Sequence, residues 1–357
     1  MYDPGKGGGE RADEINPIAL NWIRRNAKSD NWFLHVNYWD PHTPYRTPDD
    51  YGNPFEGQPI PDWHSEEVRR RNWESFGPHS AREPMGFGPS SRNYPRMPKE
   101  IASLDDYRKW IDGYDVGIRY MDDHLGELLA ELKKQGVLDD LVIIFSADHG
   151  ENQGELNVYG DHQTADYCTS RIPMIVRWPG MTAPRVDDAL YYQLDFTPTI
   201  TELAGGETSE LWHGRSFADA FRKGQSAGRD HLILGQCVWC AQRSVRFEDW
   251  IMLRTYYDGL KDFPSHMLFD LAADPHETTN LADERPDVVA RASRFLEDWH
   301  GRMMATSETN VDPLDTVLRE GPCHANDRDL PGYCERLRAT GRAHHADALE
   351  ARHPKTS

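Results

Sequence analysis

The chain has 357 residues, of which 38% are hydrophobic and 11 are tryptophans, and its formal net charge is -19 at pH 7. This is enough chain for one large domain and a smaller one with a substantial core. The negative charge argues against a general nucleic-acid-binding protein, which needs clustered Lys and Arg. No stretch approaches the ~20 apolar residues of a membrane span. Residues 1–7 hold no apolar core of a secretory signal, so the sequence leaves the localisation open.

Five cysteines are an odd number, so at least one thiol is expected to be unpaired. Cys237 and Cys240 have the spacing of half a zinc site, for which Cys323 and Cys334 are the remaining candidates. Those two are too loosely spaced for a typical second half. Structural thiols or one local disulfide are therefore the favoured interpretation.

Four segments can be assigned in the first third of the chain. Residues 14–26 have the pattern of an amphipathic helix, and residues 32–38 form a short apolar run typical of a buried strand. Residues 52–99 are rich in Pro and Gly and show no period. Apolar residues then recur at three- and four-residue steps over 110–132, which predicts a long helix ended by Gly136.

The next apolar runs predict a sheet. Residues 141–145 are a continuous β-rich run, as expected of a central parallel strand covered on both faces, and residues 172–176 are a second candidate strand. Residues 195–203 begin like another helix. Strands alternating with helices predict an α/β domain with a largely parallel sheet flanked by helices.

The pattern changes after about residue 205. Residues 243–256 and 266–271 are expected to be strands joined by turns, and residues 286–304 an amphipathic helix. The sequence therefore predicts a main domain over 1–205 and a smaller antiparallel sheet-plus-helix subdomain over 206–309. Residues 310–357 are expected to be a polar tail that wraps the protein or is loosely ordered.

Asp148 and His149 directly follow the predicted central strand, within the sequence Ser-Ala-Asp-His-Gly-Glu. Ligands of open α/β sheets bind beyond the carboxyl ends of the strands. Both side chains can point at one metal ion there, because the alternation of the strand has ended. A capped turn without a metal is an equally good interpretation of these residues alone.

Two further histidines lie in loops near predicted strand ends. His42 stands between Pro41 and Thr43-Pro44, and prolines that fix the backbone present an imidazole in one direction. An imidazole can donate to an anion or protonate a leaving oxygen near neutral pH. His162 lies between the two predicted strands and could reach the same site. Each histidine alone is a weak signal.

Taken together, the motifs resemble the sulfatases of the alkaline-phosphatase superfamily. A strand ends in Pro-His-x-Pro, and a later one ends in Ser-x-Asp-His-Gly. A loop with His162 precedes Arg171-x-Pro and Pro179-Gly180. Residues 268–282, LFDLAADPHETTNLA, are the most specific match. The resemblance covers roughly residues 10–300. It implies an alkaline-phosphatase-like fold with a smaller C-terminal subdomain, and hydrolysis of sulfate esters of a small molecule or carbohydrate.

The resemblance also implies roles for four residues. Asp148 and His149 match the second half of the metal site, which holds a divalent ion: Ca2+ in most sulfatases, with Mn2+ as the alternative. His42 matches the histidine that contacts the sulfate and assists the leaving oxygen. His162, nine residues before Arg171, matches the sulfate-binding Lys or His of the family. In this interpretation His42 and His162 are both catalytic and substrate-binding.

The sequence departs from the family in two respects that bear on catalysis. Sulfatases use a formylglycine made in a Cys/Ser-x-Pro-x-Arg motif, and no Cys or Ser of this chain has that context. The paired Asp residues that open the family's metal site are also absent. The expectation is an N-terminally truncated sulfatase that is inactive alone and exists as an oligomer or with an N-terminal complement.

Two alternatives stay open. The Asp-His pair also suits a phosphodiesterase or phosphonate monoester hydrolase of the same superfamily. A catalytically dead fragment or binding module is the other alternative. Trp63, Trp73 and Phe76 could stack on a sugar, although ordinary burial explains them as well.

Overall fold

The computed structural model describes residues 9–88, 92–181, 184–226 and 228–353. The N-terminal segment in which the sequence shows no signal core, residues 1–7, lies outside these ranges. The end of the C-terminal tail, residues 354–357, lies outside them as well. Within the described ranges, no helix combines the length and the apolarity needed to cross a membrane.

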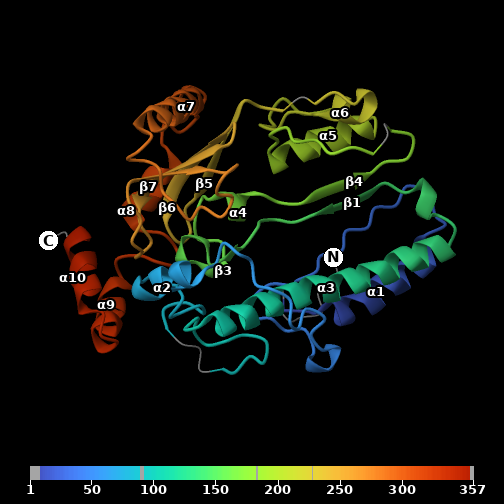
Figure 1. The fold of residues 1–357 in the computed structure, drawn as a ribbon. Coiled ribbons are helices and arrows are strands. Elements are labelled where there is room, and N and C mark those ends of the chain that lie inside the picture. The colour runs from blue at the N-terminus through green and yellow to red at the C-terminus, as the bar shows by residue number, and fades with distance from the viewer. Residues whose placement is uncertain (1–8, 89–91, 182–183, 227, 354–357) are drawn as a thin grey trace.

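Two long helices pack side by side along one edge of the molecule (Figure 1). Helix α1 (Ala12–Asn26) places Ala19 and Ile23 against Leu128 and Leu132 of α3 (Leu104–Lys134). Helix α3 begins at a capping box in which Ser103 and Asp106 satisfy each other's backbone N–H groups. The long helix that the apolar period over 110–132 predicts is therefore confirmed.

The apolar runs at 141–145 and 172–176 pair with each other as an antiparallel ribbon. Strand β1 (Ile143–Ser146) meets β4 (Met174–Arg177), with Ile143 opposite Arg177 and Ser146 opposite Met174. In Figure 1 the ribbon runs between the α1–α3 pair and a second pair, α5 (Phe196–Leu203) and α6 (Ala218–Lys223). This arrangement supports an α/β fold.

The largely parallel sheet is not what the structure shows. The sheets of the described residues are all antiparallel: β1 with β4, β2 (Asn152–Gln153) with β3 (Tyr159–Asp161), and a four-stranded sheet. Residues 32–38 are extended, with alternate side chains half-buried, but they form no strand. A strand exists only where a second backbone offers hydrogen bonds, and apolar content alone does not specify that partner.

The C-terminal sheet is an antiparallel meander of β5 (His231–Gln236), β6 (Ala241–Phe247), β7 (Trp250–Tyr257) and β8 (His266–Asp270). Helix α7 (Pro286–Ala305) covers one face through Val288, Ala292 and Leu296. The opposite face buries Ile251, Leu253 and Phe269 with Leu156 and Tyr167 packed against them. The sheet therefore supports the loop that carries His162.

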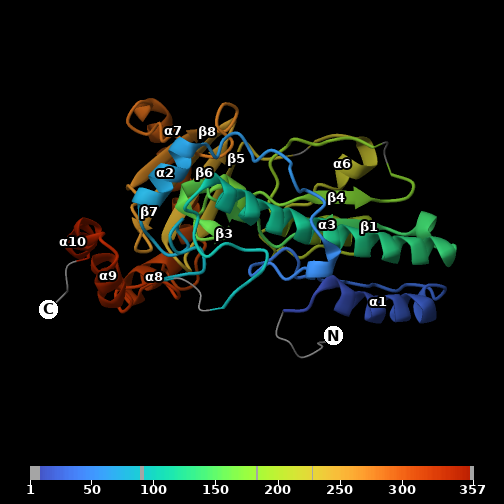
Figure 2. The same cartoon turned by 60° about the horizontal axis from the view of Figure 1, so that its bottom comes forward.

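Residues 310–353 are more ordered than their polarity suggests. They contain α8 (Pro313–Glu320), α9 (Leu330–Ala339) and α10 (Ala343–Arg352). Leu330, Tyr333 and Leu337 of α9 are buried with Phe76 and Leu260. In both views these helices lie at the end of the molecule near α2 (Glu66–Glu74) (Figures 1 and 2). Phe76 is thus a core residue and not a sugar-stacking one.

The β1–β4 ribbon leaves apolar side chains in water. Met174 and Ile175 of β4 are 37% and 63% exposed, and Val142, directly before β1, is 40% exposed. Replacing Ile175 with Lys is expected to reduce both the binding of a hydrophobic dye and self-association, because a flat ribbon with apolar side chains is an association surface. Dye fluorescence and sedimentation at several protein concentrations would measure the two effects.

The matched control is Val186→Lys, since Val186 is 84% exposed but stands outside every strand. Its dye binding and sedimentation should match those of the parent chain. If Ile175→Lys behaves like Val186→Lys, the ribbon is not the association surface.

Candidate functional site

Asp148 and His149 lie in the loop that leaves β1. His149 Nδ1 is 2.7 Å from the Gly150 carbonyl oxygen and therefore donates to it. In the neutral ring this leaves Nε2 with its lone pair, 3.7 Å from an Asp148 carboxylate oxygen. The Asp148 side chain is 87% exposed. The two side chains thus present one nitrogen and one carboxylate toward the same point.

His162 follows β3 and stacks on His149. The two ring centroids are 3.8 Å apart at an interplanar angle of 25°. Burial lowers the pKa of His162, the Asp161 carboxylate opposes this, and the charges of His149 and His42 lower the pKa further. The neutral imidazole is therefore favoured at neutral pH.

The C-terminal sheet holds the His162 loop in place through three hydrogen bonds. Gln236 Nε2 donates to the His162 carbonyl oxygen at 2.6 Å, and the Ala165 N–H donates to Gln242 Oε1 at 3.1 Å. The buried Cys240 thiol donates to the Gln163 carbonyl oxygen at 2.8 Å. Burial raises the pKa of this thiol well above its usual range, which keeps it a neutral donor.

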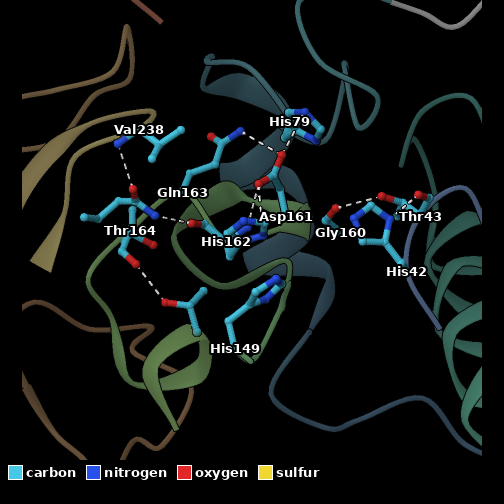
Figure 3. Close-up of polar contacts among 12 residues, drawn as sticks. His42, Thr43, His79, His149, Gly160, Asp161, His162, Gln163, Thr164 and Val238 are labelled. Carbon is cyan, nitrogen blue, oxygen red and sulfur yellow. Dashed lines mark hydrogen bonds and ion pairs between the residues drawn. The ribbon is translucent and has the colours of Figure 1, made fainter. Parts of the chain in front are cut away.

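His42 reaches the same region from the turn after residues 32–38 (Figure 3). Its Nδ1 contacts the Thr43 carbonyl oxygen, and its ring stacks on Trp39 with 4.8 Å between centroids. Thr43 Oγ1 donates to the Gly160 carbonyl oxygen at 3.2 Å, which ties this turn to the His162 loop. Gly160 has φ +64°, and a Cβ there would lie 2.5 Å from Thr43 Cγ2. Only glycine permits this close approach.

A shallow hollow opens beside His42, and its lining includes Trp39, Pro41, Tyr45 and Arg46. The lining of this hollow does not include Asp148, His149 or His162. The side chain of Arg46 is exposed. Sequence reasoning did not single out Arg46, although it stands four residues after His42 and guanidinium groups suit sulfate oxygens.

A buried charged group behind His162 was also missed. Asp161 accepts the His162 N–H at 2.7 Å and lies 3.1 Å from His79 Nε2. Lys261 is buried close by and donates to the Asn157 carbonyl oxygen at 3.1 Å. Burial lowers the pKa of Lys261 to about 7, against the opposing charge of Asp161. No local pattern marks these residues, because they come from distant parts of the chain.

The donor set of Asp148 and His149 fits two positions of a divalent-metal shell. One carboxylate oxygen and one imidazole nitrogen are suitable ligands, and the Nδ1 contact fixes the tautomer that such a ligand needs. Among the described residues, the groups of three candidate metal ligands do not include Asp148 or His149. Calcium prefers six to eight oxygens, so these two residues supply a minor part of a calcium shell.

The cysteines do not form the zinc site that their spacing allowed. All five are free, and neither Cys237 nor Cys240 belongs to a metal-like group within the described ranges. Cys334 is buried in the core with α9 and α10, where its thiol lies 3.7 Å from the Ala346 carbonyl oxygen. The interpretation as structural thiols accounts for Cys240 and Cys334.

Models of known protein families identify the class to which this chain belongs. The sulfatase family model matches residues 6–206, more than half of the chain. A second model, "N-sulphoglucosamine sulphohydrolase, C-terminal", matches residues 154–298. The chain therefore belongs to the sulfatase family.

Two curated relatives illustrate the similarity. A multifunctional alkaline phosphatase superfamily protein, PehA, from Trinickia caryophylli is 26% identical over 338 residues, covering 85% of this chain and 60% of the relative. A choline-sulfatase from Rhizobium meliloti is 25% identical over 303 residues, covering 81% of this chain and 53% of the relative. The chain thus spans between half and two thirds of the length of these two relatives.

Solved structures show the same fold. A phosphonate monoester hydrolase from Silicibacter pomeroyi superposes with a TM-score of 0.64 at 21% identity, covering 86% of this chain and 63% of that one. A protein solved with its substrate D-glucosamine-2-N,6-O-disulfate superposes with a TM-score of 0.61 at 18% identity, covering 84% of this chain and 71% of that one.

Proposed function

We propose that this chain carries the sulfate-binding and part of the metal-binding machinery of an enzyme that hydrolyses sulfate esters. The observation that supports this most is the contact of three loops: His162 stacks on His149, and the Thr43–Gly160 hydrogen bond joins the turn that carries His42 to the loop that carries His162. His42 comes from a segment more than a hundred residues before His149 and His162 in the sequence. Family membership gives this cluster its chemical interpretation.

His162 is proposed to bind the sulfate group. Its ring is half-buried, and its lowered pKa favours the neutral form at neutral pH. A neutral imidazole still carries one N–H, which can donate to a sulfate oxygen. A bound sulfate ester carries negative charge, which would raise the pKa of His162 again. Binding and protonation of this ring are therefore expected to be coupled.

His42 is proposed to assist the leaving alcohol. Its Nδ1 is occupied by the Thr43 carbonyl oxygen, so Nε2 is the nitrogen that remains for a ligand. A protonated imidazole there can give its proton to the departing oxygen, which avoids an alkoxide leaving group. Arg46 lines the same hollow and provides a positive charge for an anionic substrate.

Asp148 and His149 are proposed as two ligands of a divalent metal, Ca2+ with Mn2+ as the alternative. Such an ion polarises the sulfate group. The substrate class is proposed to be a sulfated small molecule or carbohydrate, since the relatives include a choline-sulfatase and a protein solved with a disulfated glucosamine. No Cys or Ser here has the context of a formylglycine precursor, so the chain alone is proposed to lack turnover.

Replacing His162 or His42 with Ala is expected to weaken binding of an aryl sulfate by roughly 10- to 150-fold each. Loss of one hydrogen bond to a charged group costs roughly 1.5–3 kcal/mol, and every ~1.4 kcal/mol is tenfold in affinity. Calorimetric titration of p-nitrophenyl sulfate in the presence of Ca2+ would measure the affinity, and release of p-nitrophenol the turnover.

His35→Ala is the matched control, because His35 is exposed on the extended segment that leads to His42. Its affinity should equal that of the parent chain. Unchanged affinity in both His42→Ala and His162→Ala would refute the site and favour a binding module of another kind. If the parent chain hydrolyses p-nitrophenyl sulfate and His42→Ala does not, the proposed lack of a nucleophile is refuted.

A phosphonate or phosphate diester is the second candidate substrate class. PehA is named multifunctional, and a phosphonate monoester hydrolase superposes well on this chain. The two candidates separate when p-nitrophenyl sulfate and p-nitrophenyl phenylphosphonate are titrated side by side. Tighter binding of the phosphonate would move the proposal to the second class.

A further inference from the structure

A compact group of metal-ligand side chains lies behind the Asp148–His149 loop. Cys168 Sγ is within 4.8 Å of carboxylate oxygens of Asp166 and Glu277, and these oxygens are equally close to each other. On its other side, the same sulfur is within 4.8 Å of Glu155 and His276. We call these five residues the Cys168 cluster. They come from the 155–168 loop and from residues 276–277, which follow β8.

The cluster concentrates buried carboxyl groups. Asp166 is 0% exposed, Glu277 3% and Glu155 5%. Burial raises the pKa of Glu277 well above its usual range, and the nearby Asp166 raises it further. Among the described residues, no Lys or Arg forms an ion pair with Asp166 or Glu277, and Glu155 pairs with His276 at 2.8 Å. Carboxylates without a cation are costly at this depth.

Glu277 provides a second, independent observation at the cluster. Its Oε1 accepts the Tyr167 N–H at 3.2 Å. Its Oε2 is buried and has no hydrogen-bond partner in the part of the chain that the structure describes, yet this carboxylate belongs to the group around the Cys168 sulfur. A buried oxygen beside a thiol and a second carboxylate has at most the weak S–H donor within reach, so it needs a proton or a cation for full satisfaction.

Asp166 and His276 are held in place by their neighbours. Each Asp166 oxygen accepts two hydrogen bonds: Oδ2 from Asn152 Nδ2 at 3.0 Å and the Thr169 N–H at 3.2 Å, and Oδ1 from the Thr164 and Thr169 hydroxyls at 2.6 Å each. Asp166 therefore orders the loop beside the sulfur and leaves the ligand positions to the other members of the cluster. His276 stacks on Trp63 with 4.5 Å between centroids, and 38% of its side chain is exposed. An ion can therefore enter from the His276 side.

We propose that the Cys168 cluster binds one zinc ion, with Cys168 Sγ and Glu277 Oε2 as ligands, His276 and Glu155 completing the shell, and the hydrogen-bonded Asp166 carboxylate beside it. Thiolate, imidazole and carboxylate together suit Zn2+, whereas calcium and magnesium prefer oxygen alone. The ion replaces the thiol proton and neutralises the buried carboxylates. This site is separate from the candidate catalytic residues and does not depend on the proposed function.

A zinc ion here would fix the loop that packs against the backbone beside His149. The Gly150 N–H donates to the Thr169 carbonyl oxygen at 2.8 Å, directly after Cys168. Two hydrogen bonds join residues 276–277 to this loop: the Tyr167 N–H donates to Glu277, and His276 pairs with Glu155. Zinc would thus connect the C-terminal subdomain to the backbone beside His149.

Cobalt substitution tests the proposal directly. Co2+ added to the metal-free chain is expected to give a thiolate-to-cobalt charge-transfer band in the near ultraviolet, saturating at one ion per chain, and Zn2+ should abolish it. Cys168→Ser should remove the band. Glu277→Gln should weaken Zn2+ binding by at least about 100-fold, since even outer-shell changes cost 10–100-fold. Zn2+ should raise the melting temperature of the parent chain but not of Glu277→Gln.

Cys237→Ser is the matched control, because Cys237 is a half-buried free thiol outside the cluster. It should keep the band, as should Asp148→Asn, which separates this site from the candidate catalytic metal. A parent chain without the band, or a band that survives Cys168→Ser or disappears in Cys237→Ser, would overturn the proposal. The parent chain carries no substitution and must itself show the band. The test therefore stays decisive even if a variant fails to fold.

Discussion

Gly150→Ala is expected to destabilise the chain severely. A Cβ at residue 150 would lie 1.9 Å from the Cys168 carbonyl oxygen and 3.2 Å from the Arg171 carbonyl oxygen. Both obstacles are backbone atoms, so no side-chain rotation relieves the clash. The Gly150 N–H also donates to Thr169 at 2.8 Å, which prevents the loop from moving away without losing that bond. Overpacking of this kind costs about 1–3 kcal/mol, occasionally more, and we expect the upper end.

Urea unfolding of the variant would measure this loss. Gly126→Ala is the matched control, because Gly126 lies in α3 and a Cβ there meets nothing within 4 Å. Alanine is better than glycine inside a helix by roughly 0.5–1 kcal/mol, so the control should become more stable. A Gly150→Ala chain as stable as the parent would contradict the prediction. It would show that residue 150 does not touch the backbone of Cys168 and Arg171.

The helices and the C-terminal sheet were predictable because their signals are local. Residues 110–132 and 286–304 carry the apolar period of a helix, and α3 and α7 are present over these ranges. The strands expected at 243–256 and 266–271 appear as β6, β7 and β8. In such segments the side-chain period alone selects the structure.

Strand pairing was not predictable, because it depends on residues far away in sequence. The run at 141–145 was expected in a parallel sheet, yet β1 pairs with β4 in the opposite direction. The polar segment 310–357 contains a helix, α9, that its sequence does indicate. The buried residues of α9 stand at helical spacing: Leu330, Tyr333, Cys334 and Leu337. Overall polarity had obscured a narrow apolar stripe.

The candidate site divides in the same way. Motifs close in sequence pointed to His42, Asp148, His149 and His162, while their roles rest on family resemblance. The Asp161–His79 pair and Lys261 are tertiary neighbours without a sequence motif. The Cys168 cluster joins residues over a hundred positions apart, as the Glu155–His276 contact illustrates. Spacing-based searches for metal sites find only ligands that are close in sequence.

Glu83→Ala is expected to detach the C-terminal helices from the rest of the protein. Glu83 is 0% exposed, and its Oε1 accepts from Arg336 Nε at 2.7 Å and from Arg342 Nη2 at 2.6 Å. Its Oε2 accepts from the Tyr333 hydroxyl at 2.8 Å. One carboxylate therefore anchors both α9 and the start of α10 to the 80–86 loop.

The expected loss follows from what remains after the carboxylate is removed. Arg342 is 3% exposed, and its Nη1 already lacks a hydrogen-bond partner among the described residues. Breaking a buried ion pair by removing one partner costs about 3–5 kcal/mol, because the other charge stays buried and unpaired. The lost energy is concentrated on α9 and α10, so residues 330–353 should become protease-sensitive at temperatures where the β5–β8 sheet is still folded.

Limited proteolysis followed by mass measurement, together with thermal unfolding, would show the effect. Arg338→Gln is the control, because Arg338 joins the same two helices through Asp347 and Glu350 but lies at the surface. An exposed pair contributes little, since water and salt screen it. The Glu83 variant should therefore release the C-terminal helices while the Arg338 variant keeps them. Equal protease resistance in both variants would mean that the apolar contacts of Leu330 and Leu337 hold these helices without the buried carboxylate.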